Sequence, residues 1–428
     1  MITEKITKNI VVIGSGMTGC LTAFKIAKKY KLCNIYLIDN SKEILQSFNP
    51  IKFDNVKFNN GYHALEINRS PKLFKFLKNN LRLKFFKKKS NRFLAINKFL
   101  IKENTSINNY PTSLQNCFIN KKLTSKNIVD LYYNIKNSLK KTIQITSKRY
   151  SDNINDTLHF FIPWFIPKEF NYKSNDEGNI FREKIKKKQL DNYLAVPKNG
   201  LFTSLSKAFI KQLKHLKNVK IFLNTQANYE NNEIIFINNE KKICLHYDYI
   251  FICTTPIFLL KKSKSDFLQK LTSNKKYFVC CIVKLKKKLH IKFTEIICIF
   301  SKFKEFSRFS KVNLTNNRME YLIELIFKKD SEIKNKITKS KLMKILNFLL
   351  IYNNNSLDII DLKITRKVFF PSKKTVINCK SYLKLLLRKM NVKKNRFFCT
   401  FNFGPINMTK SWIESEKNLN TIKNELSR

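Results

Sequence analysis

The stretch NIVVIGSGMTGCLTAFKIAKK, residues 9–29, contains the motif that decides the fold. It opens with a β-branched apolar run, and apolar residues recur at helical spacing through its second half. This pattern predicts a buried strand, a tight turn and a helix. The turn carries the frame G-x-G-x-x-G at Gly14, Gly16 and Gly19. In that frame the first glycine allows the turn, the second lets a pyrophosphate approach the backbone, and the third permits close helix packing.

The start of this helix and the end of the next strand predict the two halves of a dinucleotide site. The N–H groups near Met17 and Thr18 would face phosphates at the positive end of the helix dipole. The run NIYLIDN, residues 34–40, predicts a second buried strand that ends in Asp39, 20 residues beyond Gly19. An acidic side chain at that place can accept hydrogen bonds from an adenosine ribose. Asp39 also suits a turn or a helix cap, and this alternative stays open.

Glycine is rare in this chain, which makes the glycine motif informative. Only 7 of 428 residues are glycine, so three would fall by chance into one such frame with an expectation of roughly 0.002. Each of the other glycines is therefore expected to mark a backbone that needs positive φ or a close contact. Three of these lie in recognisable segments, at Gly61, Gly200 and Gly404.

With these segments the chain resembles the superfamily of FAD-dependent amine oxidases and protoporphyrinogen oxidases, which includes UDP-galactopyranose mutase. FNNGYHALEI, residues 58–67, is similar to the family's aromatic-x-x-Gly-x-His segment, with Gly61 as its glycine. In the family this segment approaches the flavin ring. LAVPKNGLFTSLSKAF, residues 194–209, is similar to the family's proline-glycine entry to a helix, although Asn199 replaces the usual second glycine. The resemblance implies FAD as the cofactor.

Two later blocks extend the resemblance. VKIFLNTQANY and YDYIFICTTP resemble the strand pair that closes the FAD domain, with Ala227 where the family backbone usually meets the adenine. FNFGPINMTKSWIESEKNLNTI, residues 401–422, is similar to the family's last helix, whose N-terminus touches the flavin, with Gly404 before it. Exposed N–H groups near Asn407 and Met408 could hold a flavin carbonyl or ribityl hydroxyl. An ordinary capped helix is the alternative, and the family's frequent Gly-Arg or Gly-Asp ahead of this segment is absent.

The resemblance also nominates one catalytic residue. It places His63 beside the isoalloxazine ring, where the imidazole could tune the flavin or handle a proton. A structural histidine that only supports Gly61 is an equal alternative. The sequence carries no Ser-His-Asp, zinc or P-loop signature.

The expected fold class is α/β, with a Rossmann-like FAD-binding domain and an inserted α+β substrate domain of mixed sheet and helices. The FAD-binding domain is expected to consist of residues 1–82, 196–262 and 396–428, and the substrate domain of residues 83–195 and 263–395.

Within the inserted domain, helical apolar spacing predicts a helix over residues 127–145. Four apolar runs predict strands, at residues 277–285, 295–300, 321–327 and 364–370.

These features favour an FAD-dependent oxidoreductase of the amine oxidase/protoporphyrinogen oxidase type, which transfers a hydride between a substrate and the flavin. The alternative is a flavin-dependent isomerase of nucleotide sugars that resembles UDP-galactopyranose mutase. An NAD-dependent enzyme or a binding protein without chemistry stays open too, because the first βαβ unit alone does not distinguish NAD from FAD. The C-terminal block favours FAD.

The formal net charge is +53, from 83 Lys+Arg against 30 Asp+Glu. This surplus is spread along the whole chain with no nucleic-acid-binding motif, which favours solvated surface lysines over a selected patch. We therefore expect a small-molecule substrate, anionic or a nucleotide sugar among the candidates, and no specific nucleic acid. Peripheral contact with a membrane surface stays open, and the composition indicates no oligomeric state.

The ten cysteines include no C-x-x-C pair, so we expect core thiols and no metal site. The N-terminus has no apolar core typical of a secretory signal, and the longest apolar stretch, near residues 250–260, is too short to span a bilayer. These features predict a cytoplasmic protein with reduced thiols.

Overall fold

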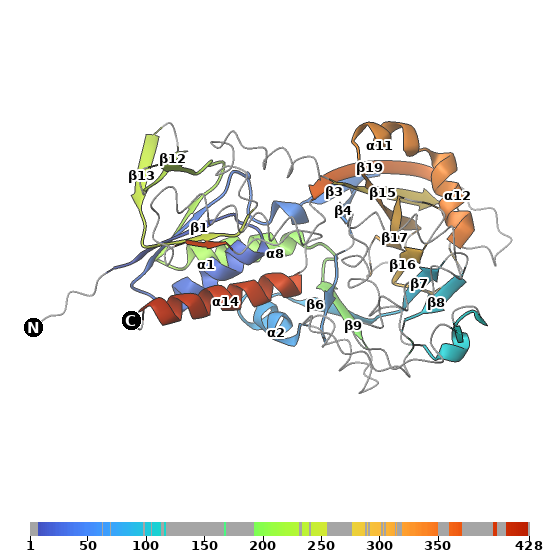
Figure 1. Ribbon diagram of the computed structural model, residues 1–428, viewed down its shortest axis with the longest axis horizontal. Helices are drawn as coiled ribbons and strands as arrows, with labels where there is room; N and C mark the ends of the chain where they lie inside the picture. Colours follow the sequence, from blue (N-terminus) through green and yellow to red (C-terminus); the bar gives the residue numbers. More distant parts are fainter. Residues whose placement is uncertain are drawn as a thin grey trace, which may run out of the picture.

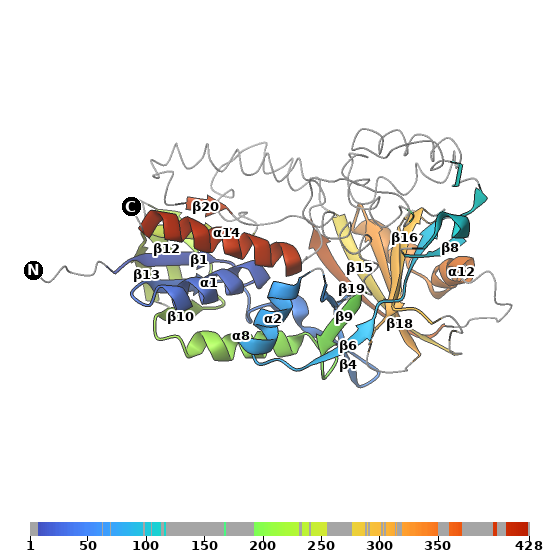
Figure 2. The same ribbon diagram turned by 90° about the horizontal axis from the view of Figure 1, so that it is seen from below.

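The computed structural model describes residues 7–61, 63–68, 70–96, 99–103, 105–112, 115–116, 167, 192–230, 233–238, 241–254, 276–286, 289, 292–300, 303, 305–312, 314, 319–349, 359–369, 397–399 and 408–426. They form an elongated mixed α/β molecule with a parallel sheet towards one end and a larger sheet towards the other (Figures 1 and 2).

The first sheet has five parallel strands in the order β10-β2-β1-β14-β20. Its central strand, β1, is buried almost completely because both faces of the sheet are covered, as its continuous apolar sequence predicts. All five strands fall within the ranges expected to bind the nucleotide. They are β1 (Asn9–Ile13), β2 (Asn34–Ile38), β10 (Val219–Phe222), β14 (Tyr249–Ile252) and β20 (Phe397–Cys399).

Helices cover one face of this sheet, and a small antiparallel sheet covers the other (Figure 1). Helix α1 lies against the strands, and α14 packs along α1, where the Asn418 amide donates to the Thr22 hydroxyl at 2.9 Å. The helices are α1 (Met17–Lys29), α2 (Pro71–Asn79), α8 (Thr203–Lys214) and α14 (Met408–Leu426). The small sheet consists of β11 (Asn228–Glu230), β12 (Glu233–Asn238) and β13 (Lys241–His246).

The second sheet is mixed and has seven strands in the order β19-β15-β18-β17-β16-β7-β8. The four expected strands are present, and the predicted helix over residues 127–145 lies outside the described residues. The strands are β7 (Arg92–Ile96), β8 (Phe99–Lys102), β15 (Lys276–Leu285), β16 (Glu295–Phe300), β17 (Phe306–Lys311), β18 (Glu320–Phe327) and β19 (Ile359–Phe369).

The two faces of this second sheet pack against different partners. Alternate residues such as Val279, Cys281 and Ile323 form a core with α11 (Ser331–Lys336) and α12 (Lys339–Leu349). The intervening residues, including Cys280, Ile282 and Leu322, face the hairpin of β3 (Pro50–Phe53) and β4 (Val56–Asn59), whose Phe53 and Phe58 pack on them. The side-chain period of two along each strand explains this division.

Short elements lie between the two sheets in the described part of the chain. The short helix η1 (Gln46–Phe48) leads into the hairpin of β3 (Pro50–Phe53) and β4 (Val56–Asn59), which turns at Asp54 and Asn55, both with positive φ. A three-stranded sheet of β5, β9 and β6 follows, and its middle strand spans the expected boundary at residues 195 and 196. These elements are β5 (Leu65–Glu66), β6 (Phe85–Lys89) and β9 (Tyr193–Pro197), and a further short helix, η2, covers Ile107–Asn109.

Candidate functional site

The glycine turn connects β1 to α1 at the carboxyl end of the parallel sheet. Gly14 has φ +102°, and a Cβ there would lie 2.7 Å from the Cβ of Thr254. A Cβ at Gly19 would overlap the carbonyl oxygen of Gly14, so the helix start packs directly on the turn. Gly16 differs, because among the described residues, its own chain neighbours apart, no atom lies within 4 Å of the place of its missing Cβ. The turn is therefore closed at Gly14 and Gly19 and open at Gly16.

The start of α1 faces this open space with its positive end. Gly16 is the N-cap, no side chain caps the helix, and its first turn carries no acidic residue. Next to it, the Ser15 hydroxyl oxygen is buried and has no hydrogen-bond partner in the part of the chain that the structure describes. A helix N-terminus without a cap and a buried unpaired hydroxyl both suit an anionic oxygen ligand. The residues at Ser15–Thr18 therefore fit a phosphate group.

Asp39 lies at the end of β2, beside the glycine turn. Its carboxylate accepts the Ser41 N–H at 2.7 Å and also the N–H of Ser15. The side chain thus holds the turn, which is the structural role left open from the sequence. Each carboxylate oxygen has two acceptor sites, so this role leaves acceptor capacity for a ribose hydroxyl.

The segment after β10 runs beside Asp39. The Thr225 N–H donates to the Asp39 carbonyl at 2.9 Å, and the Asn224 N–H donates to the Ser41 carbonyl at 2.9 Å. Ala227 follows two residues later and is buried. The structure thus brings Ala227, Asp39 and the glycine turn to one end of the sheet.

Residues 59–66, here called the 59–66 segment, run from the end of β4, in the hairpin that packs on the second sheet, to β5 of the three-stranded sheet. Gly61 has φ +103°, and a Cβ there would lie 3.7 Å from both Glu324 Oε1 and Cys280 Sγ. Buried Asn59 anchors the segment, because its amide donates to the Gly200 carbonyl at 2.8 Å and accepts the Phe202 N–H at 2.9 Å. Gly61 and Gly200 are therefore parts of one local structure, although 139 residues separate them.

His63 is half-buried in an aromatic pocket on this segment. Its ring meets Phe48 edge-on, with centroids 5.0 Å apart, and is tilted against Phe202 at 5.8 Å. Its Nε2 lies 3.1 Å from the Asn60 carbonyl oxygen, so Nε2 carries a proton that it donates. In the neutral ring Nδ1 is then the acceptor. His63 and Glu324 both approach Gly61, since a Cβ on Gly61 would lie 3.8 Å from His63 Nε2.

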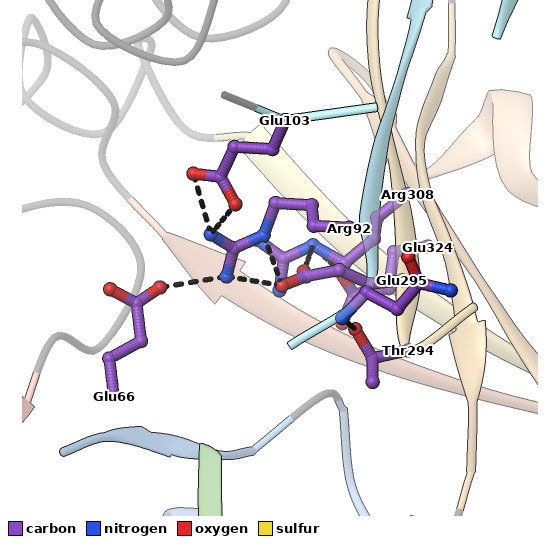
Figure 3. A network of polar contacts seen from close by, with 8 residues as sticks. Glu66, Arg92, Glu103, Thr294, Glu295, Arg308 and Glu324 are labelled. Carbon is purple, nitrogen blue, oxygen red and sulfur yellow. Dashed lines mark hydrogen bonds and ion pairs between the residues drawn. The ribbon is translucent and has the colours of Figure 1, made fainter. Parts of the chain in front are cut away.

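A buried network of charged side chains lies on the second sheet next to this segment (Figure 3). The Arg92 guanidinium binds Glu66 at 2.7 Å, Glu103 at 3.0 Å and Glu295 through Nε at 2.5 Å. Arg308 Nε lies 3.4 Å from Glu295 and 3.5 Å from Glu324. These residues come from β5, β7, β16, β17 and β18 and from the turn after β8.

Reasoning from the sequence missed this network. A usable signal is the acidic residue inside an apolar strand, such as Glu324 in EYLIELIF, because burial there requires a charged partner. The partner arginines could not be chosen from 83 basic residues. The contacts join strands that are remote in the chain, so spacing does not reveal them.

The C-terminal block is only partly described. Gly404 and Asn407 lie outside the described residues, while Met408 begins α14 and is buried. The helix docks on α1 through Lys25, whose ammonium lies 2.7 Å from the Ser415 hydroxyl and 3.3 Å from the centre of the Trp412 ring. Burial lowers the pKa of Lys25 to about 8, although the Glu416 carboxylate opposes this change.

Two buried thiols in the described parts of the chain are held protonated. Burial raises the pKa of Cys20, which sits beside the glycine turn, well above its usual value, and Asp39 raises it further. Burial raises the pKa of Cys281 to about 12. Because the thiolate is the reactive form, neither thiol suits a nucleophile.

The described residues form neither a metal site nor a membrane-spanning helix. They contain no group of three or more His, Cys, Asp or Glu side chains that could hold a metal ion. None of the described helices has the length and apolar character needed to cross a bilayer.

No protein-family model matches the sequence, and no curated protein matches it. The fold is nevertheless shared with solved structures. One is reduced UDP-galactopyranose mutase, with a TM-score of 0.65 at 12% identity over 99% of this chain and 95% of that chain. A second is a putative protoporphyrinogen oxidase from Exiguobacterium sp. 255-15, with a TM-score of 0.62 at 11% identity over 98% and 99%. A third is a putrescine oxidase redesigned in its cofactor binding, with a TM-score of 0.55 at 9% identity over 98% and 99%. The likeness confirms the expected resemblance at the level of the fold.

Proposed function

We propose that this chain is an FAD-dependent oxidoreductase of the amine oxidase/protoporphyrinogen oxidase type. The observation that carries the proposal is the open space at Gly16, in front of the uncapped start of α1. A phosphate of a dinucleotide fits there. In this proposal the parallel sheet is the Rossmann-like FAD-binding domain, of residues 1–82, 196–262 and 396–428, and residues 83–195 and 263–395 form the substrate domain.

Each predicted site residue receives a role in this proposal. The glycine turn and the N–H groups of Met17 and Thr18 hold the pyrophosphate, the Asp39 carboxylate accepts the ribose hydroxyl, and the Ala227 backbone contacts the adenine. Gly61 lets the 59–66 segment approach the flavin ring, because a side chain there would fill the contact space. The start of α14 holds the flavin carbonyl or ribityl chain, through Gly404, Asn407 and Met408.

Bound FAD would supply the hydride chemistry, and the chain would supply orientation and proton handling. His63 is the proposed catalytic residue. Its aromatic pocket and the bond from Nε2 to the Asn60 carbonyl fix the ring, so Nε2 carries the proton of the neutral ring and Nδ1 does not. The substrate is a small molecule, anionic or a nucleotide sugar among the candidates.

The purified protein tests this proposal directly. We expect a flavin absorption spectrum, release of FAD rather than FMN on denaturation, and bleaching under anaerobic conditions by a compound that the enzyme oxidises. Amines, polyprenoid or porphyrin-like compounds and nucleotide sugars are the first to screen. A protein that binds NADH tightly and no FAD contradicts the proposal.

A flavin-dependent isomerase is the second candidate, favoured by the alignment with reduced UDP-galactopyranose mutase over nearly the whole chain. The two candidates differ in electron balance. An isomerase turns over only after its flavin has been reduced, and it consumes no reductant per product formed. In an oxidoreductase the oxidised substrate reduces the flavin and an electron acceptor reoxidises it, so one acceptor equivalent is consumed for each two-electron oxidation.

A further inference from the structure

The 59–66 segment lies against the charged network at two places, so segment and network together form a ring. Figure 3 shows the charged side chains of this ring, from Glu66 to Glu324. At one end of the segment, Glu66 binds Arg92 at 2.7 Å. At the other end, Gly61 lies against Glu324, whose Oε1 is 3.7 Å from the place of the missing Cβ. Between these ends the network continues from Arg92 through Glu295 and Arg308 to Glu324. His63 lies in the middle of the segment that the ring encloses.

The sheet makes this ring rigid. Arg92 and Glu295 are opposite each other in the pairing of β7 with β16, and Arg308 and Glu324 are opposite each other in the pairing of β17 with β18. The Arg92 side chain is 3% exposed. Its planar guanidinium presents donors in a fixed fork, so three carboxylates bound to it have defined directions.

Buried ion pairs contribute little net stability, because desolvation of the charges offsets their attraction. Apolar residues of similar volume would hold the sheet equally well. What such a network does supply is one fixed arrangement of the groups that it joins. Here the network joins strands of the second sheet to β5 of the three-stranded sheet, which ends the 59–66 segment.

We infer that Arg92 is a positioning residue, which sets the 59–66 segment, and with it Gly61 and His63, at a fixed height above the second sheet. The inference rests on the proposed flavin site, because the segment is the part of the chain proposed to contact the flavin ring. Glu66 is the group through which Arg92 acts on the segment. Glu103 binds the same guanidinium but belongs to the turn after β8.

These two glutamates provide a matched pair of variants. Their side chains are 14% and 13% exposed, and they bind Arg92 at 2.7 and 3.0 Å. Glu66→Ala and Glu103→Ala should therefore lower the thermal midpoint by similar amounts. Only Glu66→Ala should shift the flavin's visible spectrum and its reduction potential. It should also lower kcat, on the order of tenfold to 100-fold, because displacement of a positioning group slows the reaction by that much.

The measurement is a redox titration and turnover assay of the wild type and both variants, with Glu66→Gln as a third. Glutamine keeps the acceptor oxygen for Arg92, so Glu66→Gln should retain most of the wild-type potential and rate. Equal shifts in both alanine variants would overturn the inference, because Arg92 would then not act on the segment through Glu66. No shift in Glu66→Ala would overturn it too, because that result assigns the contact to stability alone.

Amide hydrogen exchange separates this inference from the proposed function. In the protein without added flavin, Glu66→Ala should speed exchange in residues 60–66 by about 2- to 30-fold, and Glu103→Ala should leave it unchanged. If the wild type binds no flavin and the two alanine variants still differ in exchange in this way, the proposed function fails and the positioning by Arg92 stands. If FAD binds and exchange in the segment is the same in both variants, the positioning fails and the proposed function stands.

Discussion

The Lys25 ammonium lies 3.3 Å from the centre of the Trp412 ring, and this contact joins the first helix of the chain to the last. The Lys25 side chain is 8% exposed and also binds Ser415 and Glu416. Because α1 begins at the proposed pyrophosphate site and α14 begins at Met408, the contact sets the relative position of two proposed cofactor contacts.

This contact predicts a pH-dependent stability. Lys25 titrates near 10.5 when unfolded and near 8 when folded, so between these pH values the unfolded state binds more protons. The free energy of unfolding should therefore rise as pH increases from 8 to 10.5, by about 3 kcal/mol from this group. Lys25→Met should remove that rise and leave stability at pH 7 unchanged or higher.

Urea unfolding at pH 7, 8, 9 and 10 measures the effect. Lys28→Met is the control, because Lys28 lies on the same helix and is exposed. A rise of the same size in Lys25→Met and in the control would show that Lys25 is not its source.

The open space at Gly16 predicts a variant that separates folding from FAD binding. The Cβ of Gly16→Val would lie more than 4 Å from every described atom outside its own chain neighbours, so the fold should persist. FAD binding should be lost, because the valine occupies the approach to the pyrophosphate. Circular dichroism and flavin absorbance check the two expectations.

Gly14→Ala is the contrasting variant. Its backbone has φ +102° and its Cβ would lie 2.7 Å from Thr254, so we expect destabilisation of about 1–3 kcal/mol or more. Stoichiometric flavin in folded Gly16→Val would refute the placement of the pyrophosphate.

His63→Ala should separate FAD binding from chemistry. The proposed pyrophosphate and ribose contacts lie at Gly16 and Asp39, remote in the chain from His63, so FAD should stay bound. The reduction potential or the turnover should change. A redox titration, with turnover once a substrate is known, tests this. An unchanged potential together with unchanged turnover would assign His63 to the support of Gly61 alone.

Asn59 should be important for stability because it joins the 59–66 segment to the Gly200 turn. Asn59→Ala leaves buried groups without partners and should lower the free energy of unfolding by about 2–3 kcal/mol. Asn199→Ala removes one exposed bond in the same turn and should cost at most about 1 kcal/mol. Equal losses in denaturant unfolding would contradict the burial argument.

The parts of the fold that depend on local pattern could be predicted from the sequence. The run at residues 9–29 predicts β1, the turn and α1, because apolar period and glycine placement act within a few residues. Four strands of the second sheet were predicted for the same reason, although β19 begins at Ile359 rather than at residue 364. The network around Arg92 could not be predicted, because its members meet only after two sheets have formed.

In the proposed site, Asp39 likewise has a position that the sequence predicts and contacts that it does not predict. Its distance from Gly19 in the sequence predicts its place at the end of β2, and the structure has it there. The Asp39 carboxylate also accepts the N–H groups of Ser15 and Ser41. These bonds depend on how two turns pack together, and spacing in the sequence does not specify that packing.

The central claim is that this chain binds FAD across the glycine turn, and equilibrium titration of the flavin-free protein with FAD tests it most directly. Binding is followed by the quenching of flavin fluorescence, in the wild type and in Gly16→Val, with NAD as the competing ligand. We expect one FAD per chain in the wild type, no displacement by NAD and no binding by the folded variant. Tight binding of NAD without binding of FAD, or equal FAD binding by Gly16→Val, would contradict the claim.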